Sequence, residues 1–215
     1  MTKIRMGKKG GESMTTQGLK QIIRQRILCL REQLSAELRT QFSTEIVRRI
    51  AQLPEYQAAS IVLGYMNFGS EFESEIWAQQ VLADGKQLLL PKVNRVSKEL
   101  DIYRVADLQA DLAPGLWTIR EPLPERCVKL DVLNEVDFIL LPGVAFGRDG
   151  TRLGYGGGFY DKLLARLNKE CGIARCPALV AATYSLQLVE NIPQEVTDRK
   201  VQWLVTENEL INCAA

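Results

Sequence analysis

The sequence predicts an α/β protein in which a mainly parallel sheet is flanked by helices, as a three-layer, Rossmann-like single domain. Short, strongly apolar runs alternate with helical patterns along the chain, and this alternation is typical of parallel sheets. No internal repeat or low-complexity linker interrupts it. The chain has 215 residues, 46% of them hydrophobic, which suffices for one substantial core. We expect one domain over residues 18–215, preceded by a disordered tail over residues 1–17.

Two helices are predicted over residues 16–53. Apolar side chains recur there at every fourth position, as one buried helix face requires; they are Leu34, Leu38, Phe42, Ile46 and Ile50. Ser35 is a suitable N-cap for the second helix, and Pro54 ends the helical run.

The next part of the chain predicts a buried strand over residues 60–66, followed by a loop. A helix over residues 74–83 comes next and is closed by Asp84-Gly85. A second short strand is predicted over residues 87–93. The alternating pattern of residues 99–105 predicts a third strand, at an edge of the sheet.

The second half of the chain begins with a segment, residues 107–130, that is interrupted by prolines and glycine and is expected to be irregular. The most strongly apolar strand is predicted over residues 136–146. A glycine-rich loop and a helix to about Leu167 follow it. Further strands are predicted over residues 177–185 and 201–207.

Composition excludes several classes of function. The formal net charge of +1 gives no general reason to expect nucleic acid or a membrane surface, and no apolar run approaches about 18 residues. The five cysteines form no C-x-x-C pair and their number is odd, so we expect a reduced, cytoplasmic protein. We also expect a monomer. The chain contains no histidine, which excludes a Ser-His-Asp triad and the common histidine-containing zinc sites. Acid–base chemistry would therefore use carboxylates, lysine, tyrosine or the substrate itself.

Four glycines lie within five residues of the segment "RLGYGGGFYDKLL" (residues 152–164), directly before a helical pattern. The segment follows the most apolar strand, and ligands of parallel sheets sit at the carboxyl ends of strands. A helix start presents unpaired N–H groups and a positive dipole end, and glycines let the backbone approach an anion closely. We therefore predict a phosphate-binding loop. Arg152 would add a charge-assisted contact, and Asp161 would hold Mg²⁺ against the same phosphates.

The plain alternative is a glycine turn in which Asp161 is an ordinary acid of a first helical turn. The loop is not a Walker A loop, because no Gly-Lys-Ser/Thr follows. It matches a dinucleotide-binding fingerprint only if Phe159 replaces the last glycine. The combination of the glycines with Arg152, Tyr160 and Asp161 favours phosphate.

The longer segment "LLPGVAFGRDGTRLGYGGGFYDKLLAR" (residues 140–166) resembles the signature of the 5-formyltetrahydrofolate cyclo-ligase family, also called methenyltetrahydrofolate synthetases. The resemblance continues in order along much of the chain. It includes a basic N-terminal helix, a Y-x-x-x-x-x-E loop after the first strand, the tetrapeptide "LPKV", and a late acid before the last strand. Residues 1–17 and 107–130 take no part in it.

The resemblance implies roles for individual residues. The residues implied to bind ATP are Lys20, Arg24, Arg152, Gly154, Tyr155, Gly156, Gly157, Gly158, Phe159 and Tyr160. The residues implied to bind the folate substrate are Arg24, Met66, Glu71, Tyr155 and Phe159. Lys20 and Arg152 would be the catalytic groups, and Asp161 and Asp198 would be the carboxylates that hold Mg²⁺.

Without the resemblance, most of these residues have simpler interpretations. Lys20 and Arg24 lie four residues apart and share a helix face, but most basic pairs of this kind are merely solvated. A loop glutamate such as Glu71 is usually solvated, and Glu73 competes for its role. Met66 alone would be a core residue.

Two positions near the ends of strands stay open. Lys92 follows "LLLP" and is as consistent with a solvated strand edge as with a phosphate contact. Asp198 alone is an ordinary loop acid. The family often has a histidine directly before this aspartate, whereas this chain has Thr197, which weakens the local match.

The activity that the resemblance implies is the ATP- and Mg²⁺-dependent cyclisation of 5-formyltetrahydrofolate, in some cases polyglutamylated, to 5,10-methenyltetrahydrofolate, with release of ADP and phosphate. The γ-phosphoryl group would activate the formyl oxygen, and N10 of the same substrate would then attack the formyl carbon. Such a reaction needs positioning and charge neutralisation and no histidine base. Two alternatives stay open: another ATP-using enzyme on the same scaffold, and a noncatalytic protein that binds folate or nucleotide.

Overall fold

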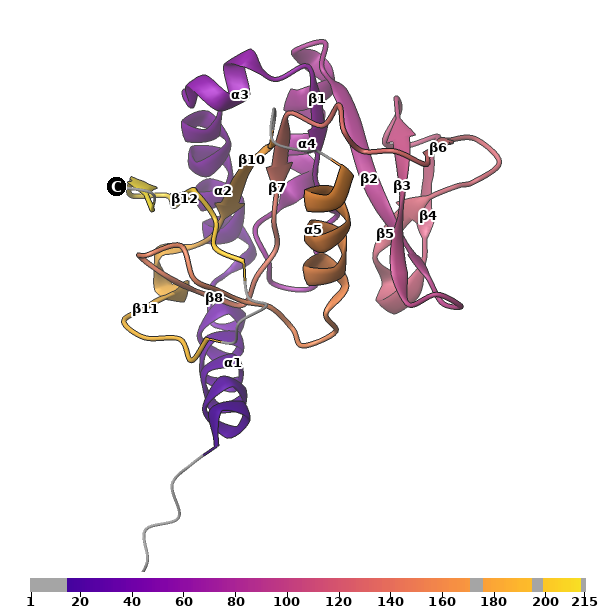
Figure 1. The fold of residues 1–215 in the computed structure, drawn as a ribbon. Helices are drawn as coiled ribbons and strands as arrows, with labels where there is room; N and C mark the ends of the chain where they lie inside the picture. The colour runs from indigo at the N-terminus through magenta and orange to yellow at the C-terminus, as the bar shows by residue number, and fades with distance from the viewer. Residues whose placement is uncertain (1–14, 171–175, 195–198, 214–215) are drawn as a thin grey trace, which may run out of the picture.

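The structure is a computed structural model that describes residues 15–170, 176–194 and 199–213. An eight-stranded sheet organises it (Figure 1). The strands are β1 (Ile61–Leu63), β2 (Gln87–Asn94), β3 (Glu99–Val105), β6 (Val128–Leu130), β7 (Phe138–Leu140), β10 (Ala178–Ala182), β12 (Trp203–Val205) and β13 (Leu210–Asn212). Their order across the sheet is β13-β12-β10-β7-β1-β2-β3-β6.

The centre of this sheet is parallel. Strands β12, β10, β7, β1 and β2 run in one direction, with registers such as Val62 opposite Phe138 and Val180 opposite Trp203. Strands β3 and β13 pair antiparallel at its two sides. The predicted mainly parallel sheet is confirmed.

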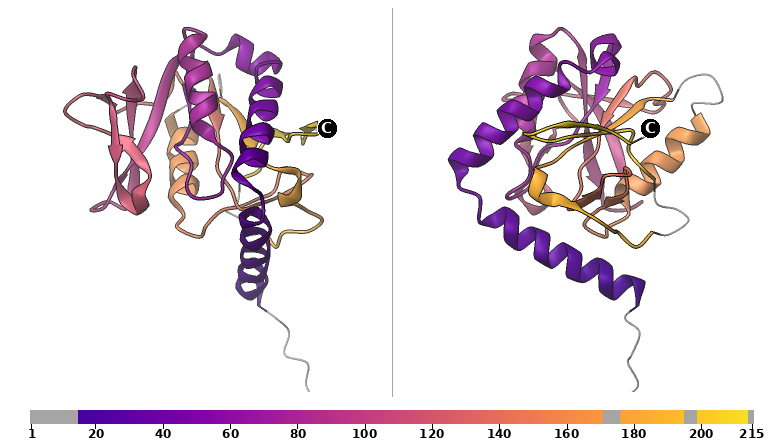
Figure 2. Two further views of the ribbon diagram at one scale, coloured as in Figure 1. Left: turned by 180° about the vertical axis from the view of Figure 1, so that it is seen from behind. Right: turned by 90° about the vertical axis from the view of Figure 1, so that its left-hand side faces the viewer.

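Helices cover both faces of the sheet, which confirms the predicted three layers. The helices are α1 (Thr16–Glu32), α2 (Ala36–Ile50), α3 (Pro54–Ala58), α4 (Ser74–Ala83) and α5 (Phe159–Glu170). Helices α2, α3 and α4 lie behind the sheet in Figure 1, and α5 lies in front of it; the view from behind in Figure 2 shows the same arrangement. Helix α1 extends beyond the sheet (Figure 1), and its Arg24 contacts the glycine-rich segment.

Two apolar clusters fill the space between these layers. On one face, Trp77 of α4 and Ile46 and Ile50 of α2 pack against the sheet. On the other face, Leu163, Leu164 and Leu167 of α5 do so. These side chains are buried almost completely, and their burial removes apolar surface from water on both faces of the strands. The parallel strands read as continuous apolar runs because both of their faces are covered.

The expected helix patterns are largely correct. Ser35 caps α2 by accepting a hydrogen bond from the N–H of Leu38 at 3.2 Å, as predicted. Leu38 itself is exposed, because a four-residue spacing drifts about 40° per step around a helix of 3.6 residues per turn. Pro54 does not only end the helical run: it begins the short helix α3, where its missing N–H costs nothing.

Three predictions about strands were wrong. Strand β3 is not at the edge of the sheet, because β6 pairs with its outer side. Residues 107–130 are not irregular throughout; besides β6 they form the hairpin of β4 (Leu112–Pro114) and β5 (Arg120–Pro122), with the 3-10 turn η1 (Leu116–Thr118) between them. The long strand predicted over residues 136–146 is divided, since β7 ends before Pro142 and Gly143.

A small second sheet follows this break. It contains β8 (Ala145–Gly147), β9 (Arg152–Leu153) and β11 (Leu188–Val189), and the 3-10 turn η2 (Ser185–Gln187) precedes β11. Strand β9 delivers the chain to the glycine-rich segment, which leads into α5. Helix α1 begins at Thr16, inside the segment predicted as a tail, and Thr15 caps it. Within the described residues, no helix has the length and apolar character needed to cross a membrane.

Candidate active site

Two loops meet at the carboxyl edge of the parallel strands. One is the Glu71 loop (residues 64–73), which follows β1, and the other is the glycine loop (residues 154–158), which precedes α5. Because α5 is the crossover between the parallel strands β7 and β10, it starts at the edge where β7 ends. The sequence prediction that the glycine loop lies at this edge is confirmed by the topology.

The glycine loop needs its glycines for backbone conformation. Gly156 has φ of +100° and Gly158 has φ of +69°, a region that side chains with a Cβ rarely adopt. From α1, Arg24 reaches the loop and donates from Nε to the carbonyl oxygen of Gly154 at 2.7 Å. The guanidinium of Arg24 also lies beside Gly156, where an added Cβ would be 3.6 Å from Nη2. The loop is thus held open next to an arginine and to the start of a helix.

Arg152 lies underneath the glycine loop, and its side chain is only 6% exposed. It donates from Nη1 to the carbonyl oxygen of Pro142 at 3.2 Å and from Nη2 to Oδ1 of Asp161 at 2.6 Å. Its Nε is buried with no hydrogen-bond partner among the described residues. A buried donor without a partner is costly, so this nitrogen favours an oxygen ligand at the site.

The Glu71 loop folds back on itself through Gly69, which has φ of +57°. This turn lets the carboxylate of Glu71 accept a hydrogen bond from the N–H of Phe68 at 2.8 Å. The hydroxyl of Tyr184, which follows β10, donates to the carbonyl oxygen of Glu71 at 3.1 Å and lies 3.2 Å from Oγ of Ser43 on α2. Glu71 is therefore a buried carboxylate, 6% exposed, on a well-anchored loop.

Burial raises the pKa of Glu71 above its ordinary value, because the charged form loses solvation. The N–H of Phe68, the charge of Arg31 and the hydroxyl of Tyr155 act in the opposite direction and lower it. Tyr155 belongs to the glycine loop, so the two loops are in electrostatic contact. The structure thus brings Glu71 and Tyr155 together, and their roles in substrate binding stay a prediction.

The other predicted site residues occupy varied positions. Lys20 is buried on α1, and Phe159 begins α5 with its ring against Gly157, where an added Cβ would lie 2.9 Å from the ring edge. Tyr160 packs between the two apolar clusters. Met66 is buried in the main cluster, which is the simpler of its two interpretations.

Lys92 does not approach the glycine loop through any contact that the structure records. Its Nζ lies 3.4 Å from Oε2 of Glu121, a buried carboxylate of β5. Glu121 also accepts a hydrogen bond from the N–H of Val93 at 3.3 Å. The lysine therefore ties the β4–β5 hairpin to β2.

The two carboxylates expected to hold Mg²⁺ cannot be compared in space, because Asp198 lies outside the described residues. Asp161 is 41% exposed at the first turn of α5, with Oδ1 bonded to Arg152. Its oxygen donors and partial exposure suit a hard cation that keeps several waters. The segment just after Asp198 runs past the turn before β9, where Lys200 pairs with Asp149 at 2.5 Å and the N–H of Val201 donates to Gly150. Among the described residues, no group of three potential metal ligands gathers here or elsewhere.

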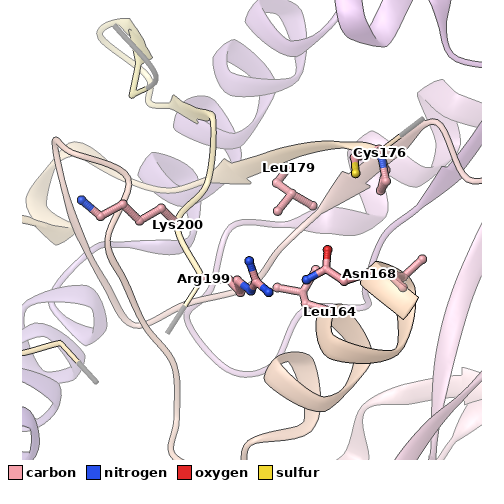
Figure 3. Close-up of a pocket in the computed structure, with 8 residues that line it drawn as sticks. Leu164, Asn168, Cys176, Leu179, Arg199 and Lys200 are labelled. Atoms are coloured by element: carbon pink, nitrogen blue, oxygen red, sulfur yellow. The ribbon is translucent and has the colours of Figure 1, made fainter. Parts of the chain in front are cut away.

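A hollow of about 280 Å³ lies away from this site (Figure 3). It is lined by the later part of α5, the start of β10 and the segment before β12, with Asn168, Cys176 and Arg199 around it and Lys200 pointing away. Another hollow, of about 540 Å³, lies between α1 and the η2–β11 segment. Neither contains residues of the glycine loop or Glu71, so neither is the candidate active site.

Sequence reasoning missed three residues that complete the site: Arg31, Tyr65 and Tyr184. Arg31 could have been found, because Lys20, Arg24 and Arg31 form one basic stripe along α1, and Lys20 and Arg31 are buried. Charged side chains at buried positions of a helix indicate a partner or a ligand. Tyr65 is the tyrosine of the Y-x-x-x-x-x-E loop, although the resemblance assigns it no role. Tyr184 gave no signal, since it reads as an ordinary residue near the end of a strand.

The fold and these loops together define a class of protein. It is an α/β domain in which a glycine loop at a helix start lies near a buried carboxylate at the carboxyl edge of a parallel sheet.

Comparisons with known proteins identify the family. The sequence profile described as the 5-formyltetrahydrofolate cyclo-ligase family matches residues 16–207. A probable 5-formyltetrahydrofolate cyclo-ligase of Caenorhabditis elegans is 29% identical over 197 residues, which cover 90% of this chain and 95% of that protein. The 5-formyltetrahydrofolate cyclo-ligase of Haemophilus influenzae is 30% identical over 190 residues, covering 86% and 95%. This chain belongs to the 5-formyltetrahydrofolate cyclo-ligase family, and it is an ATP-using ligase of folate one-carbon metabolism.

Solved structures agree. A 5,10-methenyltetrahydrofolate synthetase of Aquifex aeolicus superposes with a TM-score of 0.76 at 34% identity, over 92% of this chain and 94% of that one. A synthetase of the same name from Mycoplasma pneumoniae, with a TM-score of 0.67 and 19% identity, supports the fold alone.

Proposed function

We propose that this cyclo-ligase binds the triphosphate of ATP with the glycine loop and its basic neighbours and binds 5-formyltetrahydrofolate beside Glu71. The observation that carries the proposal is the convergence of three elements at one edge of the sheet. Arg24 comes from α1, Arg152 from β9, and Glu71 from the loop after β1. An anion site and a buried carboxylate that face each other suit two substrates of different charge.

The phosphate contacts follow from the donors. N–H groups of the glycine loop and of the first turn of α5 donate to phosphate oxygens, and the helix dipole favours their negative charge. Arg24 stands beside the loop, and the unpaired Nε of Arg152 supplies a further donor. Lys20, on the same face of α1 as Arg24, adds a positive charge to this group.

The folate contact follows from the carboxylate of Glu71. A pterin ring presents neighbouring N–H donors on its edge, and an ionised carboxylate accepts from both. Tyr155 and Phe159 supply aromatic surface beside the loop, and Met66 supplies apolar surface below it. Burial strengthens such a bond, because little water competes for the same donors.

The reaction then needs positioning more than acid–base chemistry. The formyl oxygen of the substrate attacks the γ-phosphorus and ADP leaves. N10 attacks the activated formyl carbon, phosphate departs with the oxygen, and the proton of N10 is lost to the departing phosphate. Arg152 and Lys20 neutralise charge on the phosphoryl group during transfer, and the loops hold the two substrates in contact.

Mg²⁺ fits the oxygen donors expected here, and Asp161 and Asp198 would hold it. When bound, it neutralises negative charge on the phosphates of the nucleotide. A polyglutamylated tail on the folate, the cytoplasmic location and the monomeric state stay predictions.

The test is turnover of 5-formyltetrahydrofolate by the purified chain with ATP and Mg²⁺, followed by the absorbance of the methenyl product. We expect product to form only when all three are present. Asp198→Asn should raise the Mg²⁺ concentration needed for half-maximal turnover, with an unchanged melting temperature as the fold control. Absence of product from the unmodified chain would contradict the activity, and an unchanged Mg²⁺ requirement would remove Asp198 from the metal site.

A further inference from the structure

Arg31 lies buried between the two loops of the active site. It belongs to the last turn of α1 and is 2% exposed. Its Nε donates to Oγ of Ser70 in the Glu71 loop at 3.2 Å, and its Nη2 donates to the hydroxyl of Tyr155 in the glycine loop at 2.9 Å. One planar guanidinium therefore bonds both loops at once, which its fixed fork of donors allows.

Tyr155 continues this connection. Its ring is 44% exposed, and the guanidinium carbon of Arg31 lies 5.9 Å from the ring centroid. Its hydroxyl lowers the pKa of the Glu71 carboxyl by hydrogen bonding. A hydroxyl that accepts from a guanidinium is polarised and becomes a stronger donor. The chain of donors thus runs from Arg31 through Tyr155 to Glu71.

Two further tyrosines interact electrostatically with the carboxylate of Glu71. Tyr65, after β1, and Tyr160, on α5, both have pKa values raised by burial first and then by the negative charge of Glu71, so both stay neutral. Among the described residues, Arg31 is the cation whose charge lowers the pKa of Glu71. Burial acts against ionisation of this carboxyl, and Arg31 opposes that effect.

We propose that Arg31 is a positioning residue that, together with Tyr155, ties the glycine loop to the ionised carboxylate of Glu71, so that nucleotide binding strengthens folate binding. The inference rests on the proposed function, because it takes the glycine loop as the nucleotide site and Glu71 as the folate ligand. A nucleotide fixes the backbone that carries Tyr155, and the fixed hydroxyl holds Glu71 charged and correctly oriented. By linkage, folate strengthens nucleotide binding by the same factor.

One nitrogen of the Arg31 guanidinium makes no hydrogen bond within the part of the chain that the structure describes. Nη1 of Arg31 is buried without a hydrogen-bond partner among the described residues. An unpaired buried donor is unfavourable, so the arrangement is not explained by stability of the empty protein alone. A role in holding Glu71 for a ligand accounts for why a charged group is kept there.

The experiment measures the dissociation constant of 5-formyltetrahydrofolate by calorimetry, with and without adenylyl imidodiphosphate and Mg²⁺, over a range of pH. The variants are Tyr155→Phe, Arg31→Met and Arg31→Lys, and Arg26→Met is the matched control on an exposed position of the same helix. In the unmodified protein we expect the nucleotide analogue to tighten folate binding by about fivefold or more. Tyr155→Phe should bring this factor close to one, while Arg26→Met should leave it unchanged.

The pH profile separates positioning from mere structure. Without the charge of Arg31 the pKa of Glu71 rises, so folate binding of Arg31→Met should begin to fail at a higher pH than that of the unmodified protein and should recover as the pH is raised. Arg31→Lys should restore part of the profile. In a Glu71→Gln background, Arg31→Met should have no effect on the pH profile, because the titrating group is gone.

Three outcomes are distinguishable. If the unmodified protein binds no folate, the proposed function fails. If it binds folate but Tyr155→Phe keeps the full effect of the nucleotide, the proposed link between the loops is wrong. If Arg31→Met weakens folate binding equally at every pH, or shifts the profile equally in the Glu71→Gln background, Arg31 does not act through Glu71 and the proposal is overturned.

Discussion

The two loops of the active site differ in burial and in anchoring. The Glu71 loop is buried and anchored at three points: the N–H of Phe68 bonds its carboxylate, Tyr184 bonds its backbone carbonyl, and Oγ of Ser43 accepts from the N–H of Glu73 at 3.0 Å. The glycine loop is exposed over residues 155–157 and is anchored to α1, through the bonds of Arg24 to Gly154 and of Arg31 to Tyr155. The first loop is held in place without a ligand, whereas the second presents its backbone to a bound anion. The Glu71 loop can thus select the folate, and the glycine loop can bind the charged nucleotide.

The largest effect is expected where the glycine loop loses its backbone freedom. Gly156→Val places a β-branched side chain at φ of +100°, beside the guanidinium of Arg24. Strain of this kind costs about 1–3 kcal/mol, and displaced N–H donors add to it, so ATP affinity should fall about a hundredfold. Titration with a nucleotide analogue checks this.

The matched control for that variant lies in the other loop. Gly69 also has a positive φ, of +57°, and an added Cβ there would meet no atom within 4 Å. Gly69→Asn should keep the fold and the ATP affinity, because asparagine tolerates this conformation. Unchanged nucleotide binding by a folded Gly156→Val variant would show that the glycine loop is not the phosphate site.

A smaller effect is expected when the Glu71 loop keeps its shape and loses the charge of its carboxylate. Glu71→Gln should weaken folate binding at least about tenfold, because it removes hydrogen bonds to a charged group worth about 1.5–3 kcal/mol, while ATP binding changes little. Separate titrations of the two ligands are the measurement. Equal losses of affinity for both ligands would contradict the assignment of folate to the Glu71 loop and of ATP to the glycine loop.

Stability gives an independent check on the same variant. Burial raises the pKa of Glu71, so the folded protein holds this proton more tightly than the unfolded chain does. The stability that this carboxyl contributes is full at low pH and is lost as the pH rises through the folded pKa. Glu71→Gln should remove this dependence and keep or raise the melting temperature near neutral pH. A marked drop in melting temperature would mean that the carboxylate is structural.

The smallest effect concerns Tyr184, which anchors the Glu71 loop. Tyr184→Phe removes the hydroxyl between Ser43 and the carbonyl of Glu71 and should cost about 1 kcal/mol of unfolding free energy. Folate affinity should fall less than in Glu71→Gln. Tyr56→Phe is the control, because the hydroxyl of Tyr56 bonds Asp84 at 2.7 Å in a part of the fold without a site residue. Equal folate affinities for the two variants would show that the anchor does not support the site.

The sequence predicts the layers and the glycine loop because both depend on local patterns. Apolar periodicity marks the helices that cover the sheet, and a dense glycine cluster before a helix marks the anion site. The resemblance to the family adds Lys20, Arg24 and Glu71, whose local sequence carries no signal of function. The hairpin at residues 112–122 is missed, because its short strands are set by pairing with each other and by the buried Glu121, not by an apolar pattern.

The contacts between loops are beyond local patterns for a physical reason. Arg31 meets Ser70 and Tyr155, which lie 39 and 124 positions away in the chain. Such contacts are fixed by tertiary packing, and a helix pattern can say only that a charge is buried. The edge position expected for β3 fails for the same reason, since three residues of β6 from a distant loop cover it.

The position of α1 has a consequence for the order of folding. It is the first described element along the chain, yet the hydrogen bonds that its Arg24 and Arg31 make to the loops reach residues 39 to 130 positions away. Its docking must therefore wait until most of the chain has been made and the sheet has formed. Helix α1 is then an element that is synthesised early and seated late, and amides along it should exchange with deuterium sooner than those of β7 or β1. Because it carries Lys20 and Arg24, the proposed site is complete only once α1 has docked.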